Sequence, residues 1–521
     1  MSTALPTAGR QTVASVLRHR VDTSPNAPFL LFDTDRAEPS TLTFAEVWEL
    51  ARGGAAVLSS LGVGRGDRFA VVVGNCPEFF ACWFGAAILG ATVVPVNPAS
   101  TTDDLTYAFA HSSSKAVICG SQQLETVRNA WRGAPQAIVV TGTDFGSRAA
   151  EAVVELGHPV EPHDLLSIMY TSGTTSRPKG VMVTHANYVT AGHVVAQQLR
   201  IRADDRWMVV LPLFHANAQY YCVMSALVSG ASVAVAERFS ASRWPAQVSR
   251  CDATLGSLFA APVRMILAQP NSPLDHQNRL RACLFAQNLT AEQLETFERR
   301  FGCPLRQWYG MTETIAPPLM NPLYGPHDNM TVGLPTESGR VRIVDDAGVD
   351  VAAGESGTLL VGGHPGTTLM LGYLDDATAF AEAYDDGWLN TGDVMLRRHD
   401  GFLAFRDRAK DMIKRSGENV AAAEVERVLN AHPAVFESAV VGVPDPVYGE
   451  GIKAVVVLDD QCGDVPSADQ MVEFCRGHLP KGKVPDVIEF TADLPRTSVG
   501  KIRKHLLRSE QSRPTSPHGR I

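Results

Sequence analysis

The stretch Tyr170-Thr-Ser-Gly-Thr-Thr-Ser-Arg-Pro-Lys-Gly180 places two glycines, five Ser or Thr hydroxyls and two cationic side chains in eleven consecutive residues. Mostly apolar residues 165–169 precede it and residues 181–183 follow it, which predicts a strand, an exposed loop and a second strand. Gly173 allows the backbone to approach a ligand closely, and hydroxyls, N–H groups and cations can converge on one anion. The stretch therefore predicts a polyphosphate-binding loop, and a Ser/Thr-rich surface turn is the alternative.

This loop differs from a Walker P-loop, in which Gly-Lys is followed by Ser or Thr. Here Lys179 follows Pro178 and precedes Gly180. A formal match to the Walker spacing occurs at residues 477–483, but Val484 stands where a hydroxyl would be needed for Mg²⁺. We interpret that second match as chance.

The composition is typical of a soluble globular protein with more than one domain. The chain has 521 residues, of which 45% are hydrophobic and 19% charged, and this length exceeds one ordinary core. Its net charge of −9 argues against a nucleic-acid partner, which a basic face would indicate. Nine scattered cysteines without a C-x-x-C pair, and no apolar core in residues 1–10, favour a reducing, cytoplasmic location.

Residues 79–96 form a long apolar run that could suggest a membrane span. Gly90 and Pro95 interrupt this run. We therefore predict a buried helix, Pro77–Leu89, followed by a buried strand, Thr92–Val96, and no membrane partner.

Strands and helices alternate through residues 28–285, which predicts a doubly wound α/β fold. Thr43-Phe-Ala-Glu46 is a capping box that opens a helix to about Leu61. From Val341 to Val361, short β segments with Gly turns predict a small antiparallel subdomain. Charge density rises around residues 405–411, and the remainder predicts a compact α+β domain with helices Ala422–Asn430 and Ala468–His478.

Two candidate site residues follow the predicted strands of the α/β part. His215 lies just beyond the strand Met208–Leu211, where α/β sheets bind ligands, and a structural histidine is the alternative. Glu313 lies in the motif Tyr309-Gly-Met-Thr-Glu-Thr314 and could hold Mg²⁺; a solvated loop acid is the alternative.

Two further candidates lie in polar segments nearer the C-terminus. Asp393 ends the predicted polar loop Trp388–Asp393 and could accept sugar hydroxyls, or form an Asx-type turn. Lys501 follows Gly500, so its amine could project from a loop; a solvated basic loop is the alternative.

In this order and spacing, these motifs resemble the adenylate-forming superfamily of acyl-CoA synthetases, adenylation domains and firefly luciferase. The resemblance covers nearly the whole chain. Residues 212–217, residues 239–243 and Ser176 look most like the crotonobetaine/carnitine-CoA ligase branch and its bacterial relatives.

The resemblance implies a large N-terminal domain, residues 1–408, that binds ATP and an acid, and a small mobile domain, residues 409–521. It implies an ATP-dependent acid–CoA ligase that needs Mg²⁺. The carboxylate attacks the α-phosphate and gives acyl-AMP and pyrophosphate; the small domain then rotates, and the thiol of CoA attacks the acyl carbon. Activation is needed because oxide is a very poor leaving group, and cations must offset charge when two anions join.

By motif position, the resemblance also assigns residue roles. Catalysis is assigned to Thr174, to Lys501 between the carboxylate and the α-phosphate, to Glu313 on Mg²⁺, and to His215 as gate of the acyl pocket. The implied ATP and AMP contacts are Thr171, Ser172, Gly173, Thr175, Lys179, Ala286, Gln287, Asn288, Tyr309, Gly310, Met311, Thr312, Asp393 and Arg408, of which Asp393 and Arg408 would bind the ribose. The hinge is Lys410, and the implied CoA tunnel is Ser416 and Gly417. The implied acyl pocket is Ala216, Tyr220, Phe259, Ala260, Thr314 and Ala316.

The sequence departs from the family pattern at two places. Ser176 stands where the family usually has Gly, which adds a Cβ at the loop tip. Ala286-Gln287-Asn288-Leu289 replaces the usual Gly-Gly-Ala-Pro beside adenine, so bulkier side chains occupy that loop.

Three functions remain open from the sequence: an acyl-CoA ligase, a free-standing enzyme that loads an aryl or other acid onto a carrier protein, and a non-catalytic nucleotide-binding relative. Phe214-His215 stands where amino-acid-activating domains place an Asp, and the intact Thr174, Glu313 and Lys501 argue against a non-catalytic protein. The small, uncharged residues of the implied pocket favour a bulky or apolar acid. The oligomeric state is open, and a homodimer is compatible with the sequence.

Overall fold

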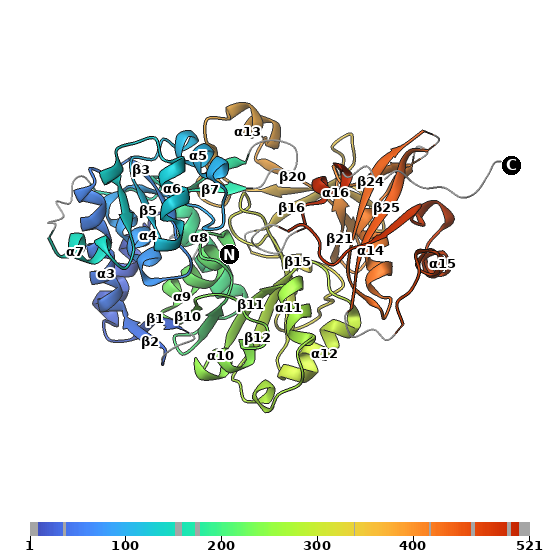
Figure 1. The fold of residues 1–521 in the computed structure, drawn as a ribbon, viewed down its shortest axis with the longest axis horizontal. Coiled ribbons are helices and arrows are strands. Elements are labelled where there is room, and N and C mark those ends of the chain that lie inside the picture. Colours follow the sequence, from blue (N-terminus) through green and yellow to red (C-terminus); the bar gives the residue numbers. More distant parts are fainter. Residues whose placement is uncertain are drawn as a thin grey trace.

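The computed structural model describes residues 9–34, 38–151, 159–171, 178–337, 339–415, 418–446, 448–459, 464–496 and 502–509. Within these ranges the chain forms a seven-stranded sheet, a nine-stranded sheet and two five-stranded sheets. Figure 1 shows the first two on one side of the molecule and the C-terminal sheet on the other, with a smaller sheet between them.

The seven-stranded sheet has the order β18-β8-β7-β4-β3-β5-β6 and carries the predicted phosphate loop. Its strands are β3 (Arg68–Val72), β4 (Thr92–Pro95), β5 (Val117–Cys119), β6 (Ile138–Val140), β7 (Leu165–Thr171), β8 (Lys179–Thr184) and β18 (Gly372–Tyr373). The helices beside it are α3 (Phe44–Ser60), α4 (Pro77–Leu89), α5 (Thr102–His111), α6 (Leu124–Ala130) and α7 (Asp144–Glu151). Strands β3 to β7 pair in parallel, whereas β7 and β8 form the antiparallel pair on either side of the loop.

The nine-stranded sheet has the order β15-β14-β13-β12-β11-β9-β10-β1-β2. Its strands are β1 (Pro28–Asp33), β2 (Ser40–Thr43), β9 (Arg206–Val209), β10 (Ser232–Ala236), β11 (Leu255–Phe259), β12 (Ala282–Ala286), β13 (Leu305–Tyr309), β14 (Leu319–Met320) and β15 (Leu334–Pro335). Helices α9 (Met224–Ser229), α10 (Trp244–Arg250), α11 (Ala260–Leu267) and α12 (Ala291–Phe301) connect them. The central strands β13, β12, β11 and β9 are mutually parallel, as the doubly wound prediction requires.

One continuous apolar core joins the two large sheets. It includes Val71 from the first sheet, Trp207 from the second, and Trp83 and Tyr188 from helices α4 and α8 (His185–Gln198). Helix α8 is buried along most of its length, and the N-terminal helix α2 (Val13–Thr23) packs against it through Val13, whose N–H donates to His185. This shared core fixes the sheets relative to one another, so the loops at their edges have a rigid support.

The small antiparallel sheet has the order β16-β17-β20-β19, with β21 paired to β20. Its strands are β16 (Arg340–Val344), β17 (Ser356–Gly362), β19 (Tyr384–Asp385), β20 (Trp388–Arg397) and β21 (Leu403–Arg408), and helix α13 (Ala377–Ala383) precedes β19. The prediction that Trp388–Asp393 is a polar loop is wrong, because these residues begin β20. Burial alternates along this strand, with Leu389, Thr391 and Asp393 inward, so polar residues occupy positions where a strand pattern would show apolar ones.

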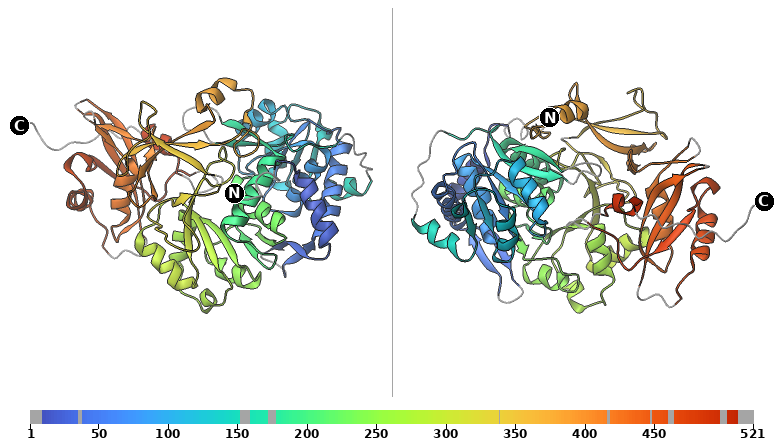
Figure 2. Two further views of the ribbon diagram at one scale, coloured as in Figure 1. Left: turned by 180° about the vertical axis from the view of Figure 1, so that it is seen from behind. Right: turned by 45° about the horizontal axis from the view of Figure 1, so that its top comes forward.

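The C-terminal sheet has the order β23-β22-β25-β24, with β26 paired to β25. It contains β22 (Ile413–Arg415), β23 (Glu418–Val420), β24 (Val435–Asp445), β25 (Gly449–Leu458) and β26 (Val487–Phe490), with helices α14 (Ala422–Asn430), α15 (Ala468–His478) and α16 (Lys504–Ser509). Figure 2 shows this part beside the small sheet and α12 from two further directions. Strand β21 ends at Arg408 and β22 begins at Ile413; the functional boundary at residues 408/409 stays a prediction.

Apolar stretches in this fold are short or interrupted. No helix in the described ranges reaches the length and hydropathy of a membrane span. The predicted helix Pro77–Leu89 is α4, and the predicted strand Thr92–Val96 is β4, which ends one residue earlier at Pro95; Gly90 between them is in the left-handed conformation.

Candidate active site

The carboxyl ends of four parallel strands meet at one edge of the nine-stranded sheet. His215 follows β9, Phe259 and Ala260 mark the end of β11, Ala286 ends β12 and Tyr309 ends β13. Ligands of α/β sheets bind at this edge, because loops leaving neighbouring strands surround one space there. The fold therefore gathers predicted acyl and adenine contacts that are far apart in the sequence.

His215 lies between β9 and a π-helix, η3 (Asn217–Val223). The backbone N–H of His215 donates to the carbonyl of Pro212 at 3.1 Å, and the centroid of its imidazole ring lies 4.3 Å from that of the Phe214 ring. Burial lowers the pKa of His215 to about 4, so the imidazole is neutral at neutral pH. The sequence analysis did not predict the π-helix, a rare element that frequently occurs at functional sites.

The residues of the predicted acyl wall are mostly buried. Tyr220, Ala260, Thr314 and Ala316 are buried, whereas Ala216 and Phe259 are half-buried. The hydroxyl of Tyr220 is buried and has no hydrogen-bond partner in the described part of the chain.

Other polar groups of the same wall are occupied within the protein. The amide of Gln219 donates to the carbonyl of Leu213 at 2.7 Å and accepts from the hydroxyl of Tyr188 at 2.6 Å. The side-chain oxygen of Asn217 accepts from the hydroxyl of Ser257 at 2.8 Å. These bonds leave a wall that offers few polar groups to an acid.

Glu313 and Lys179 both contact Tyr373, which the sequence analysis did not single out. The Tyr373 hydroxyl donates to Oε1 of Glu313 at 3.2 Å, and Nζ of Lys179 lies 4.7 Å from the centre of its ring. Tyr373 reaches this position because β18 pairs with β8, opposite Val181. The carboxylate predicted for Mg²⁺ therefore lies close to the cation at the end of the predicted phosphate loop.

The residues around Glu313 can be tested for their fit to Mg²⁺. Mg²⁺ prefers oxygen ligands and is commonly bound by one or two carboxylates together with substrate phosphates. No group of three or more His, Cys, Asp or Glu side chains in the described ranges could hold a metal. Glu313 fits a single protein ligand, with the remaining ligands supplied by a nucleotide and water.

Asp393 connects the small sheet to β13. Its Oδ2 accepts from the Tyr309 hydroxyl at 2.5 Å, and Arg408 Nε lies 3.2 Å from Oδ1. Asp393 and Arg408 are direct partners across β20 and β21. Oδ1 is buried and, apart from its ion pair with Arg408, accepts no hydrogen bond from the described residues, so it can still accept one from a sugar hydroxyl.

The loop after β12 keeps a backbone shape that glycine would adopt more easily. Gln287 has φ of 77°, in the left-handed region, at a position where the family usually has Gly. Its carbonyl accepts from the amide of Gln307 at 3.0 Å, and the carbonyl of Asn288 accepts from Arg264 at 3.2 Å. Both Gln287 and Asn288 are exposed, so their side chains do not fill the loop's interior.

The remaining predicted residues divide into two groups. The first group is described by the structure. Thr171 pairs with Lys179 at the base of the loop, and Lys410 is exposed between β21 and β22. The Met311 N–H donates to Thr314 at 2.9 Å in a turn that includes Thr312. Outside the described residues lie Ser172, Gly173, Thr174, Thr175, Ser416, Gly417 and Lys501. The roles of all predicted site residues therefore stay predictions.

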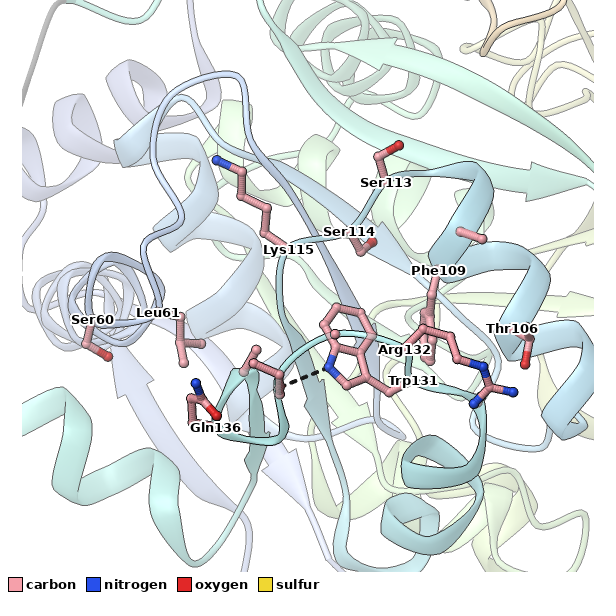
Figure 3. A pocket seen from close by; sticks show the side chains of 15 residues that line it. Ser60, Leu61, Thr106, Phe109, Ser113, Ser114, Lys115, Trp131, Arg132 and Gln136 are labelled. Carbon is pink, nitrogen blue, oxygen red and sulfur yellow. Dashed lines mark hydrogen bonds between the residues drawn. The ribbon is translucent and has the colours of Figure 1, made fainter.

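A surface cavity of about 660 Å³ lies elsewhere, beside α3 and α5. Figure 3 shows Trp131 in its centre, with Phe109 and Lys115 around it. The Trp131 indole N–H donates to the carbonyl of Ala134 at 3.1 Å. None of the predicted site residues lines this cavity, so it is not the predicted acyl pocket.

Comparison with known proteins decides the family. Residues 17–374 match the AMP-binding enzyme family, and residues 424–501 match the AMP-binding enzyme C-terminal domain. The chain belongs to the AMP-binding enzyme family. This AMP-binding enzyme is 34% identical over 519 residues to the crotonobetaine/carnitine–CoA ligase of Proteus mirabilis, covering 96% of this chain and 99% of that one. It is 35% identical over 463 residues to the ligase of the same name from Escherichia coli, covering 86% and 89%.

Solved structures of aryl-CoA ligases have the same fold. An anthranilate CoA ligase in complex with anthranoyl-AMP aligns with a TM-score of 0.88 and 26% identity, over 96% of this chain and 97% of that one. A benzoate CoA ligase from Burkholderia xenovorans aligns with a TM-score of 0.85 and 27% identity, over 96% and 100%. The predicted superfamily, the α/β fold class and the enzyme class, an AMP-forming acid–thiol ligase, are confirmed by these relatives.

Proposed function

We propose that this AMP-binding enzyme activates a bulky or apolar carboxylic acid with ATP and Mg²⁺ and transfers the acyl group to CoA. The observation that carries the proposal is a pair of contacts made by the segment Tyr309–Glu313, which continues from the end of β13. Glu313, Tyr373 and Lys179 form one of them, and Tyr309, Asp393 and Arg408 form the other. The first contact suits phosphates with a divalent cation and the second suits a ribose, which together describe a nucleotide.

The first step in this proposal forms a bond between a carboxylate oxygen and the α-phosphorus and breaks the bond from that phosphorus to pyrophosphate. Lys179, and Lys501 by motif position, would offset the charge of the two approaching anions. Bound Mg²⁺ would supply further positive charge at the phosphates. In the second step the sulfur of CoA attacks the acyl carbon, and AMP leaves with the electron pair of the broken C–O bond.

The choice of acid rests on the charge of the pocket wall. Segments 215–222, 258–263, 285–288 and 314–317 contain no Lys, Arg, Asp or Glu, and His215 is neutral because burial lowers its pKa to about 4. An uncharged wall disfavours a charged acyl chain, because a charge leaving water would find no partner. We therefore propose an uncharged acyl chain, in contrast to the cationic crotonobetaine named for the relatives.

A matched pair of acids tests this choice. Crotonobetaine and 5,5-dimethylhex-2-enoic acid have the same shape, and they differ in a quaternary nitrogen against a quaternary carbon. We expect acyl-CoA and AMP from the neutral acid at a kcat/KM at least about tenfold higher than from crotonobetaine, since a tenfold difference corresponds to only about 1.4 kcal/mol. A preference for crotonobetaine would overturn the proposed acid class while leaving the ligase activity in place.

The cysteines support a proposal for the location of the enzyme. The eight described cysteines are all free, and seven of them are buried, which fits a reducing cytoplasm. The homodimer stays a prediction.

A further inference from the structure

Arg264 occupies an unusual position for a charged side chain. It lies on α11, directly after the acyl-wall segment, and only 9% of its side chain is exposed. One guanidinium nitrogen donates to the carbonyl of Asn288, in the loop predicted to contact adenine, at 3.2 Å. Another nitrogen forms an ion pair with Glu437, which lies on β24 of the C-terminal domain. A single buried cation therefore contacts both the adenine loop and the C-terminal domain.

Glu437 extends this contact toward the segment that carries Lys501. Its side chain is 5% exposed, and its second oxygen accepts from Arg496. Arg496 forms a β-bridge with Ile502, and Lys504 contacts Glu426 at 2.7 Å. The described residues on both sides of 497–501 thus lie on the face of the C-terminal domain that includes Glu437.

Two further contacts of the C-terminal domain lie close to the predicted hinge. Arg508 on α16 donates to Asp411 at 2.8 Å, and the backbone N–H of Ala423 donates to Asp407 at 3.2 Å. By contrast Lys414 on β22, beside the predicted CoA-tunnel residues, is exposed. In the orientation seen here, Glu437 and its partner Arg496 lie against α11 of the N-terminal part.

The adenine loop needs support because its backbone is strained. Gln287 adopts a left-handed φ of 77°, which a residue with a Cβ rarely takes without help from its surroundings. Its neighbours supply that help, since Gln307 binds the carbonyl of Gln287 and Arg264 binds that of Asn288. Rotation of the C-terminal domain would separate Glu437 from Arg264, so the guanidinium would lose the carboxylate that holds it beside the carbonyl of Asn288.

We propose that Arg264 is a positioning residue that links the adenine loop to docking of the C-terminal domain in its adenylating orientation, through Glu437 and Arg496. This inference rests on the proposed function. It means that the loop is best held when the domain carrying Lys501 is docked, and that departure of the domain loosens the nucleotide site. The residue would then favour acyl-AMP formation without taking part in transfer to CoA.

Two partial reactions separate this role from general stability. The first is exchange of labelled pyrophosphate into ATP with an apolar acid, and the second is acyl-CoA formation from supplied acyl-AMP. We expect R264M to lower kcat/KM for ATP in exchange by at least about thirtyfold, since the carbonyl of Asn288 loses a charged donor and Glu437 keeps only Arg496 as its partner. Acyl-CoA formation from acyl-AMP should stay within about threefold of wild type. The conservative R264K keeps the charge but not both contacts. Its kcat/KM for ATP in exchange should lie between those of wild type and R264M.

A matched control uses another buried ion pair, in which the Arg300 side chain donates hydrogen bonds, among the residues that the structure describes, only to residues 266–275 of the N-terminal part. Arg300 and Asp275 are 2.8 Å apart, with side chains 6% and 1% exposed, inside the nine-stranded part of the fold. R300M should lower thermal stability and affect both partial reactions alike. E437Q should reproduce the selective loss of R264M, and the double variant should lose no more than about threefold beyond the worse single variant, because both act on one contact.

Each outcome decides the inference. Equal loss of both partial reactions in R264M, or unchanged exchange in both R264M and E437Q, would overturn the positioning role. If R264M fails to fold, E437Q and R264K decide instead, with the same expected selectivity. Failure of the proposed function looks different, since wild-type enzyme would then exchange no pyrophosphate with any acid.

Discussion

Gly310 offers a sharp test of how the nucleotide motif is packed. It lies between Tyr309 and Met311, and a Cβ built on it would lie closer than 3.0 Å to the hydroxyl oxygen of Tyr221. Tyr221 is buried, and its ring centroid lies 4.8 Å from that of Trp308, so the hydroxyl cannot swing aside freely. We therefore expect Gly310→Ala to displace the motif that carries Thr312 and Glu313.

The size of the effect follows from the same contact. Overpacking of this kind costs about 1–3 kcal/mol, which is a rise of about 5- to 150-fold in the KM for ATP if the nucleotide contacts bear the shift. Without the hydroxyl oxygen, the nearest atoms to the new Cβ are the Pro317 Cα at 3.5 Å and the Tyr221 Cζ at 3.6 Å, both ordinary contacts. Gly310→Ala should therefore raise the KM for ATP much less in the Tyr221→Phe background than in wild type. The double variant Gly310→Ala/Tyr221→Phe is compared with Tyr221→Phe alone for this purpose.

The assay is the KM for ATP in pyrophosphate exchange, with the thermal midpoint measured alongside. Equal losses in Gly310→Ala with and without Tyr221→Phe would refute the reasoning, because the hydroxyl would then not be the obstacle. A Gly310→Ala enzyme with wild-type KM would refute it equally.

Three further predictions concern catalysis, metal and pH. Lys501→Ala should abolish pyrophosphate exchange yet largely spare thioester formation from supplied acyl-AMP, and equal loss of both reactions would contradict the assignment of Lys501. Glu313→Gln should raise the Mg²⁺ concentration for half-maximal exchange by at least about tenfold, because a metal ligand is lost. Tyr373→Phe removes only the hydrogen bond to Glu313 and should raise that concentration less. A larger rise in Tyr373→Phe than in Glu313→Gln would argue against metal binding by Glu313. Burial lowers the pKa of His185 and of His215 to about 4 in the folded protein. As pH falls from about 6.5 to about 4, these histidines therefore take up protons in the unfolded chain before they do so in the folded one. Each should lower the free energy of unfolding by up to about 3 kcal/mol across that window. His185→Gln should flatten the fall measured by urea unfolding, and an unchanged slope would contradict this.

Elements with a clear local pattern are predictable from the sequence. The helices Pro77–Leu89, Ala422–Asn430 and Ala468–His478 have the predicted bounds, and the capping box of Thr43 and Glu46 forms as expected. In α4 a continuous apolar run lies between Pro77 and Gly90, and in α14 and α15 apolar residues recur with the spacing of a helix face.

The error at residues 388–393 has a physical cause. Thr391 and Asp393 occupy the buried face of β20, where a strand normally shows apolar residues. Asp393 is there because it binds Tyr309 and faces Arg408, so a site residue replaced the pattern that would have identified the strand.

Tyr373 and Arg264 were not predicted because their roles depend on contacts across the fold. Tyr373 reaches Glu313 only through the pairing of β18 with β8, and Arg264 meets Glu437 from another domain. No local motif records such contacts. The sequence showed Gln287 in place of the usual Gly, but only the structure shows that Gln287 adopts a left-handed φ.

The central claim is that a carboxylate oxygen attacks the α-phosphate of ATP, and oxygen labelling tests it directly. The enzyme would be incubated with ATP, Mg²⁺, CoA and an apolar acid carrying ¹⁸O in its carboxylate, and the products analysed by mass spectrometry. The account predicts acyl-CoA together with AMP that contains one labelled oxygen, because the attacked phosphorus keeps the acid's oxygen when sulfur displaces AMP. Unlabelled AMP, or ADP in place of AMP, would contradict it.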